Sequence, residues 1–140
     1  MNLIDTNIIA YAYDISEPIK RKKCLNLLEE VFDGKIDVFI SNQVLAELFH
    51  TITKNFKKPY GNKEAKIIVS LFIKSRNWKK INYNHNTVEK AMELSEKFKI
   101  SFWDALISAT MIENNIFTIY TENEKDFKKI PGLKIINPLN

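Results

Sequence analysis

The sequence predicts an α/β fold in which helices flank a central, mostly parallel sheet, over one domain that spans residues 1–140. Short apolar runs alternate with longer stretches of helical periodicity along the whole chain, and this alternation is typical of parallel sheets. A length of 140 residues, an apolar fraction of 45% and a charged fraction of 27% are ordinary for one globular domain. No internal repeat, low-complexity segment or linker interrupts the pattern.

In the first half of the chain, turn and capping residues separate the expected elements. Pro18 suits the first turn of a helix that Gly34 can end. Ser41 or Asn42 can cap the helix that follows the second strand, and Pro59-Tyr60-Gly61 forms a turn. The expected elements are a strand over 2–4, helices over 8–12 and 18–34, a strand over 38–40, and helices over 42–52 and 62–75.

In the second half, two helices lie between weaker and stronger strand patterns. The apolar run Phe117–Tyr120 indicates a strong strand, whereas 78–83 is a weak strand or a connector. The other expected elements are helices over 87–98 and 102–112 and a weaker strand over 133–136. In the earlier helix over 62–75, the residues expected to face inward are Ile67, Ile68, Leu71 and Phe72.

Composition limits the classes of function. The net charge of +4 comes almost entirely from lysine, which permits a polyanionic partner such as RNA but equally suits solvated lysine-rich faces. The single cysteine, Cys24, excludes a disulfide framework within the chain, and we expect it to pack in the core of a protein from the reducing cytoplasm. No apolar stretch is long enough for a membrane span, and no secretory signal precedes Asp5.

Three acidic residues follow the apolar runs at positions that a parallel sheet would bring to one edge. Asp5 comes directly after the first expected strand, although it could instead only cap the next helix. Glu47 lies one turn into the helix after the second strand, off the apolar stripe, and a solvent-facing glutamate is the alternative. Because ligands of such sheets bind at the carboxyl ends of the strands, these positions are candidates for a site.

Asp104 lies in a helix that is apolar nearly all round. A carboxylate in a buried helix must be paired, hydrogen-bonded or bound to a metal, but a capping box that begins at Ser101 is the alternative explanation. The neighbouring Trp103 could stack on an unpaired RNA base, as could Tyr11, but for Trp103 we expect core packing. A further polar group could come from the loop over 121–126, which follows a strand.

Together these carboxylates predict a divalent-metal site. Clustered carboxylates raise one another's pKa, and a divalent cation relieves their repulsion. Oxygen ligands without cysteine or histidine favour Mg²⁺, with Mn²⁺ as a second possibility, and such ions commonly serve phosphoryl chemistry.

Four segments, in this order and spacing, resemble the PIN-domain nucleases, particularly the VapC-type toxins of toxin–antitoxin pairs. The segments are Leu3–Asn7, Ser41–Glu47, Phe102–Ile107 and Thr121–Phe127, followed by Pro131-Gly132-Leu133. The resemblance covers essentially the whole chain. It implies an α/β/α sandwich and a cytoplasmic, Mg²⁺- or Mn²⁺-dependent ribonuclease that cleaves RNA with an activated water. It also implies a homodimer and a cognate antitoxin that covers the active site.

The resemblance also implies the roles of individual residues. Asp5 and Asp104 would bind the metal, and Glu47 would complete the catalytic group. Thr6 and Asn7 would support this group through hydrogen bonds.

The fourth position departs from the family pattern. Asn123 stands where many relatives have an aspartate, so it brings no negative charge, and Asp126 either compensates or holds the loop. The departure favours chemistry with one metal ion over two.

Three other functions remain open at the level of sequence. One is a PIN-like module that binds RNA or a partner without cutting. Another is a phosphatase with an aspartate nucleophile, although Asn7 stands where such enzymes need a second acid. In the third, the acidic residues serve only as helix caps and surface charges.

Overall fold

The five strands form one parallel sheet. The computed structural model describes residues 1–140, and its sheet has the order β3-β2-β1-β4-β5 with every neighbouring pair parallel. The strands are β1 (Asn2–Ile4), β2 (Val38–Ser41), β3 (Trp78–Ile81), β4 (Thr118–Tyr120) and β5 (Lys134–Ile136). The predicted α/β fold with a parallel sheet is therefore confirmed, and the sheet is parallel throughout.

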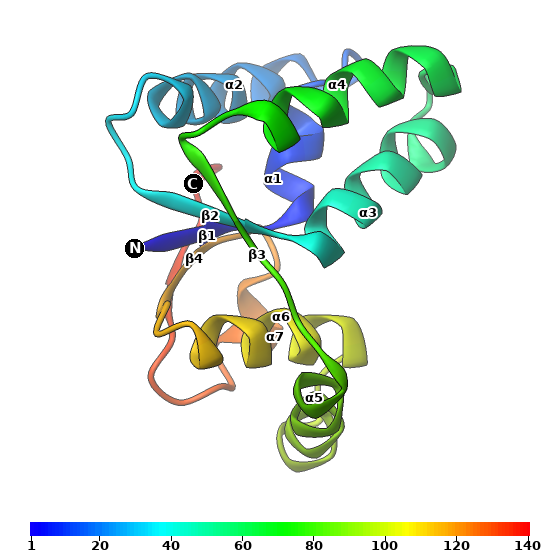
Figure 1. Cartoon of the computed structure of the whole chain (residues 1–140). Coiled ribbons are helices and arrows are strands. Elements are labelled where there is room, and N and C mark those ends of the chain that lie inside the picture. Colours follow the sequence, from blue (N-terminus) through cyan, green and yellow to red (C-terminus); the bar gives the residue numbers. More distant parts are fainter.

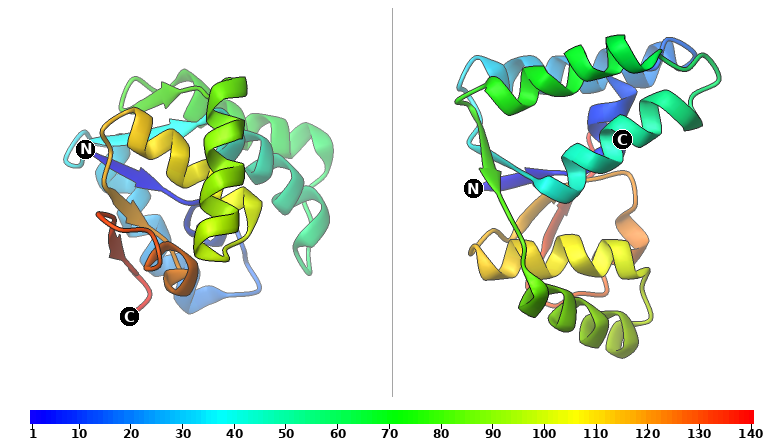
Figure 2. Two further views of the ribbon diagram at one scale, coloured as in Figure 1. Left: turned by 90° about the horizontal axis from the view of Figure 1, so that it is seen from below. Right: turned by 45° about the vertical axis from the view of Figure 1, so that its right-hand side comes forward.

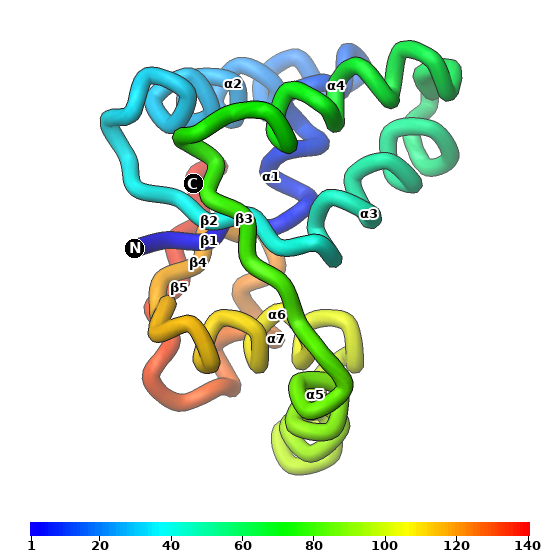
Figure 3. Tube along the Cα trace, viewed as in Figure 1, coloured from blue at the N-terminus to red at the C-terminus, as the bar shows by residue number.

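The helices form a layer on each face of the sheet (Figures 1 and 2). One layer contains α1 (Thr6–Tyr11), α2 (Pro18–Phe32), α3 (Asn42–His50) and α4 (Asn62–Lys74), with a short π-helical segment, η1 (Thr51–Asn55), after α3. The other contains α5 (His85–Phe98), α6 (Phe102–Glu113) and α7 (Glu124–Phe127). Figure 3 shows that the chain passes from the first layer to the second through β3.

Several helices differ from the sequence prediction, and α1, for example, begins at Thr6 instead of residue 8. Helix α5 begins at His85, two residues earlier than expected, because Asn84 and Thr87 form a capping box around its first turn. The segment expected to be a loop after β4 contains the short helix α7. The expected turn chemistry was correct for α2, which starts at Pro18.

The strand order reverses at β1. Strand β2 pairs with one edge of β1, and β3 extends the sheet on that side. The chain then crosses back, and β4 pairs with the other edge of β1. In open α/β sheets this reversal leaves a crevice beyond the carboxyl ends of the two strands. Asp5 follows β1 and Thr121 follows β4, so both lie at that crevice.

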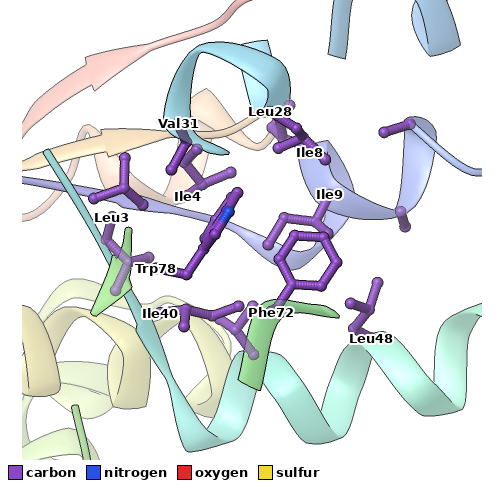
Figure 4. Packing of buried hydrophobic residues seen from close by; sticks show 14 of the residues in the cluster. Leu3, Ile4, Ile8, Ile9, Leu28, Val31, Ile40, Leu48, Phe72 and Trp78 are labelled. Atoms are coloured by element: carbon purple, nitrogen blue, oxygen red, sulfur yellow. The ribbon is translucent and has the colours of Figure 1, made fainter. Parts of the chain in front are cut away.

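The main core lies between the sheet and the layer that contains α2 and α4 (Figure 4). Trp78 is fully buried, with its ring 4.8 Å from that of Phe72 in an edge-on arrangement. Cys24 is fully buried in the same cluster, which confirms the prediction that it is a packing residue. Burial raises the pKa of its thiol to about 11.

The inward face of α4 was predicted only in part. Ile68 and Phe72 are buried, but Ile67 and Leu71 are 60% and 49% exposed. The buried stripe of this helix runs through Ala65, Ile68, Val69 and Phe72, which have the i, i+3, i+4, i+7 spacing of one helix face. Ile67 and Leu71 lie beside this stripe, so their side chains point away from the sheet.

The expectation that Trp103 packs in the core is wrong. Its side chain is 58% exposed, although most of α6 is buried. The continuously buried part of this helix runs from Ala105 to Met111, and Trp103 lies before it in the first turn. No helix of the structure has the length and apolar character that a membrane crossing requires.

Candidate active site

A pocket of about 230 Å³ lies at the carboxyl edge of the sheet and contains the predicted acidic residues. Its walls come from Asp5 and the first turn of α1, from α3 and η1, from the first turns of α6 and from the loop after β4. The lining residues are Asp5, Thr6, Asn7, Glu47, Thr51, Asp104, Ile107 and Asn123. The fold thus brings together residues that are up to 118 positions apart in the sequence.

Asp5 both caps a helix and lines the pocket. It is 6% exposed, and its Oδ1 accepts a hydrogen bond of 2.7 Å from the backbone N–H of Thr6 at the start of α1. Its Oδ2 accepts a bond of 2.8 Å from the Thr121 hydroxyl, which follows β4. Asp5 can therefore cap α1 and lie in the site at the sheet edge at the same time, because different oxygens bind Thr6 and Thr121.

Glu47 lies in the pocket with its carboxylate held from two sides. The Thr6 hydroxyl donates to Oε1 at 2.9 Å, and Gln43 Nε2 lies 3.4 Å from Oε2. Gln43 is one turn earlier on α3 and is only 5% exposed. Glu47 is half-buried in this arrangement, so the alternative of a freely solvated glutamate does not hold.

Asp104 projects from the first turn of α6. Ser101 caps this helix through a bond of 3.4 Å from the Asp104 N–H, so the predicted cap is present. The carboxylate of Asp104 has a different partner, because Asn123 Nδ2 donates to its Oδ2 at 2.6 Å. Capping by Ser101 therefore leaves the Asp104 carboxylate in the pocket.

The pKa values of Asp5 and Asp104 both lie well above the ordinary range of an aspartate. Burial raises the pKa of Asp5 to about 6, against the lowering effect of its bonds from Thr121 and Thr6. Burial also raises the pKa of Asp104 to about 7, followed by the negative charges of Asp5, Asp126 and Glu47. Burial thus disfavours the charged form of both carboxyl groups, and for Asp104 the neighbouring acids add to this effect.

The donor set fits a hard divalent cation, although no three side chains among the acids, histidines and cysteines lie close enough to hold one by themselves. Asp5 and Asp104 offer two carboxylates, and Asn7 and Asn123 offer amide oxygens in the same pocket. Such oxygen donors are the ligands of Mg²⁺ and Mn²⁺, which keep several waters in their coordination shell. Two carboxylates with water therefore suit one ion.

Comparison with known proteins agrees with this architecture. A model of the PIN domain family matches residues 3–133. The chain belongs to the PIN domain family. The predicted resemblance is therefore confirmed, and the match extends over nearly the whole chain.

Several solved structures are similar to this PIN domain. A toxin–antitoxin complex from Klebsiella pneumoniae is 24% identical with a TM-score of 0.68, and the match covers 99% of this chain and 98% of that one. The VapBC2 complex of Rickettsia felis, bound to a DNA fragment from its promoter, is 26% identical with a TM-score of 0.68 and coverage of 97% of both chains. A Mycobacterium tuberculosis toxin, VapC20, described as cleaving the sarcin-ricin loop, is 18% identical with a TM-score of 0.68 and coverage of 95% and 97%. Comparison with curated proteins gives no match.

Asp126 does not line the pocket of this PIN domain. It lies on α7 and affects the site through Asp104, whose pKa it raises by a hydrogen bond and by its charge. Asn7 does line the pocket, and its Oδ1 lies 3.4 Å from the backbone N–H of Glu122.

The loop after β4 of the PIN domain is held by a cluster of three side chains. Tyr11 donates to Glu122 Oε1 at 2.8 Å, and Lys20 lies 3.0 Å from Glu122 Oε2. The Lys20 ammonium also lies 4.7 Å from the centre of the Tyr11 ring. These contacts join α1 and α2 to the loop that carries Thr121 and Asn123.

Sequence reasoning missed three residues of the site, Gln43, Thr51 and Ile107, and indicated Thr121 only as part of the loop over 121–126. Thr51 and Ile107 line the pocket, Thr121 binds Asp5, and Gln43 reaches Glu47. Helical spacing was the available signal, because Thr51 follows Glu47 by four residues and Ile107 follows Asp104 by three.

Proposed function

We propose that this protein is a divalent-metal-dependent endoribonuclease that hydrolyses RNA phosphodiester bonds and acts as the toxin of a toxin–antitoxin pair. The observation that carries the proposal is the pocket of a PIN domain in which Asp5, Glu47 and Asp104 meet at the carboxyl edge of the sheet. The similar structures from Klebsiella pneumoniae and Rickettsia felis belong to toxin–antitoxin complexes, and the described target of the Mycobacterium tuberculosis toxin is an RNA loop.

Asp5 and Asp104 are the residues that would hold the ion, with Mg²⁺ or Mn²⁺ as the expected species. Burial raises the pKa of both groups, so a bound cation would favour their charged forms. The bound ion would lower the pKa of a water and offset the charge that develops on the phosphate.

The other residues of the pocket orient these groups. Thr6 holds one oxygen of Glu47, which leaves this carboxylate positioned to orient the attacking water and to accept its proton. Thr121 holds Asp5, and Asn123 holds Asp104 through its amide nitrogen. The carbonyl oxygen of Asn123 is then the atom that can hold a water, while Asp126 supports Asp104 from α7.

Charge-removing substitutions test this assignment. We expect Asp5→Asn and Asp104→Asn each to reduce cleavage of RNA at least about 100-fold, because each change removes a negatively charged oxygen ligand of the ion that would act on the reacting phosphate. The measurement is gel-resolved cleavage of a mixed RNA pool in Mg²⁺ or Mn²⁺. Asp33→Asn, at an exposed helix end, is the matched control, and EDTA should stop the wild type.

Full activity in either pocket variant, with the fold intact by circular dichroism, would contradict the proposed site. The departure at Asn123 also favours one second candidate, a PIN-like module that binds RNA or a partner without cutting it. Retention of RNA on a gel without metal-dependent cleavage would support that alternative.

The exposed face of α4 is a further surface that we assign to the antitoxin, in addition to the active site that the resemblance implies it covers. Ile67 and Leu71 line a groove of about 650 Å³ together with Lys63, Lys66 and Lys74. An apolar groove edged by lysines is complementary to an amphipathic segment with acidic flanks.

A charge placed in this groove tests the antitoxin assignment. We expect Ile67→Asp to weaken binding of the cognate antitoxin at least about 10-fold, because it sets a carboxylate against an apolar anchor and acidic flanks. Ile73→Asp is the control, since Ile73 is half-exposed on α4 but outside the groove. Isothermal titration calorimetry gives both affinities, and equal losses in the two variants would contradict the assignment.

The homodimer and the cytoplasmic location remain proposals that rest on the family. Sedimentation equilibrium of the purified chain would test the first, and a mass near 16.4 kDa at micromolar concentration would contradict it. Fractionation of the source cells would test the second.

A further inference from the structure

Trp103 is the one large aromatic side chain beside the pocket that the fold leaves exposed without an internal explanation. Its side chain is 58% exposed, and it immediately precedes Asp104, which lines the pocket. A tryptophan can bury roughly 150–250 Å² of surface, so leaving it in water forgoes a large hydrophobic contribution to stability. Tyr11, the other aromatic considered for stacking, is engaged with Glu122 and Lys20.

The backbone of Trp103 is fixed relative to the catalytic carboxylates. The buried Gln43 side chain donates to the Trp103 carbonyl at 2.9 Å, and the same nitrogen lies 3.4 Å from Glu47. Gln43 keeps these contacts although its own Oε1 is buried without a hydrogen-bond partner, which costs roughly 1–3 kcal/mol. One side chain therefore sets the spacing between Trp103 and Glu47.

The ring of Trp103 is also braced on one side only. It meets the Phe102 ring edge-on, with 5.2 Å between the centroids and an angle of 74° between the planes. Phe102 is itself partly buried against the second core cluster between α5 and α6. The indole is thus connected to the core through Phe102, while most of the indole surface faces solvent.

We propose that Trp103 is a stacking platform for one unpaired base of the RNA substrate, next to the phosphate that is cut. This inference rests on the proposed function. Proteins that recognise single-stranded RNA hold splayed bases on exposed aromatic rings, and each such contact contributes roughly 1–3 kcal/mol. A platform held by Gln43 beside Glu47 and Asp104 would fix which linkage of a loop enters the pocket. The substrate class is therefore RNA with unpaired bases at the cleavage point.

Kinetics of three variants test the platform. Trp103→Ala should lower kcat/KM for a hairpin RNA cut in its loop by about 10- to 100-fold, since 1.4 kcal/mol corresponds to tenfold. Trp103→Phe should recover most of this loss because a ring remains. Phe117→Ala is the matched control, because Phe117 is 46% exposed but precedes β4 at the opposite edge of the sheet.

Fluorescence gives a readout that does not depend on cleavage. The only other tryptophan, Trp78, is fully buried, so stacking of a base should quench the emission of Trp103 alone. We expect single-stranded RNA oligonucleotides in EDTA to quench the wild type, and to leave Trp103→Phe unchanged.

The outcomes separate this inference from the proposed function. If wild type does not cut RNA in Mg²⁺ or Mn²⁺ but RNA still quenches Trp103, the ribonuclease proposal fails and the platform stands. Equal kcat/KM for wild type and Trp103→Ala, without quenching, would overturn the platform. Conversion of a dimer to a monomer by Trp103→Ala, with no effect on RNA affinity, would assign this ring to a subunit interface and would also overturn the platform.

Discussion

At the scale of single residues, side chains of the pocket serve the fold and the site at once. Asp5 begins α1 through Oδ1 and binds Thr121 through Oδ2, so a helix cap fixes the orientation of a candidate metal ligand. Ser101 takes over the capping of α6, which releases the Asp104 carboxylate for the pocket. For Asp5 a local hydrogen bond, readable from the sequence, orients a candidate carboxylate, whereas the Asp104 carboxylate is oriented by Asn123, which lies 19 positions away.

The buried thiol of Cys24 predicts a pH dependence of stability. Its pKa is about 11 in the folded chain, against roughly 8.5 when unfolded, so the folded state holds the proton more tightly. This contribution is complete below about pH 8.5 and is lost as the pH rises towards 11. At pH 10 the loss should reach about 2 kcal/mol.

Urea denaturation of wild type and Cys24→Ala at pH 8 and pH 10 measures this effect. The difference between the two free energies of unfolding should shrink by about 2 kcal/mol between these pH values, because alanine cannot titrate. A difference that stays constant would show that the thiol is not the titrating group.

At the scale of elements, capping residues explain the helix boundaries better than periodicity does. Helix α5 starts at His85 because Asn84 Oδ1 accepts from the N–H groups of Asn86 and Thr87, at 2.9 Å and 3.4 Å. The apolar pattern alone suggested a later start. The same limit of periodicity applies to α4, where the buried stripe includes Ala65 and Val69 instead of Ile67 and Leu71.

Loss of this cap should destabilise the protein. We expect Asn84→Ala to lower the free energy of unfolding by about 1 kcal/mol, because it leaves two N–H groups of the first turn without their partner. Asn86→Ala, at an exposed position two residues further along, should change it by less than about 0.5 kcal/mol. Thermal or urea unfolding compares the two, and equal effects would contradict a role for the Asn84 side chain.

At the scale of the whole molecule, the parallel sheet creates the site. Asp5, Glu47, Asp104 and Asn123 come from four separate segments, and the reversal of strand order at β1 brings these segments to one edge. The negative charge that collects there works against folding unless a cation offsets it. Metal affinity and stability should therefore be linked.

A divalent cation should raise the melting temperature of the protein. At a concentration 100 times its dissociation constant, Mg²⁺ or Mn²⁺ would add about 2.7 kcal/mol, or about 5–10 °C for a chain of this size. Asp104→Asn should abolish the shift, whereas Asp33→Asn should keep it. Differential scanning calorimetry in EDTA and in each metal measures it, and a wild type that does not respond would contradict a metal site.

The sequence by itself determined the order of strands and helices, the parallel α/β class, the packing role of Cys24 and the three acidic candidates. These features follow from local rules, since periodicity, capping residues and turn residues act within about one helical turn or one strand. They were therefore available before any contact between distant segments was known.

Only the tertiary structure decided the partners within the site and the exposure of Trp103. The bonds from Thr6 to Glu47, from Thr121 to Asp5 and from Asn123 to Asp104 join residues 41, 116 and 19 positions apart. Likewise, whether a face of α4 or the first turn of α6 is covered depends on where neighbouring elements end. Such contacts depend on how distant segments meet across the sheet, and no local pattern in the chain encodes that geometry.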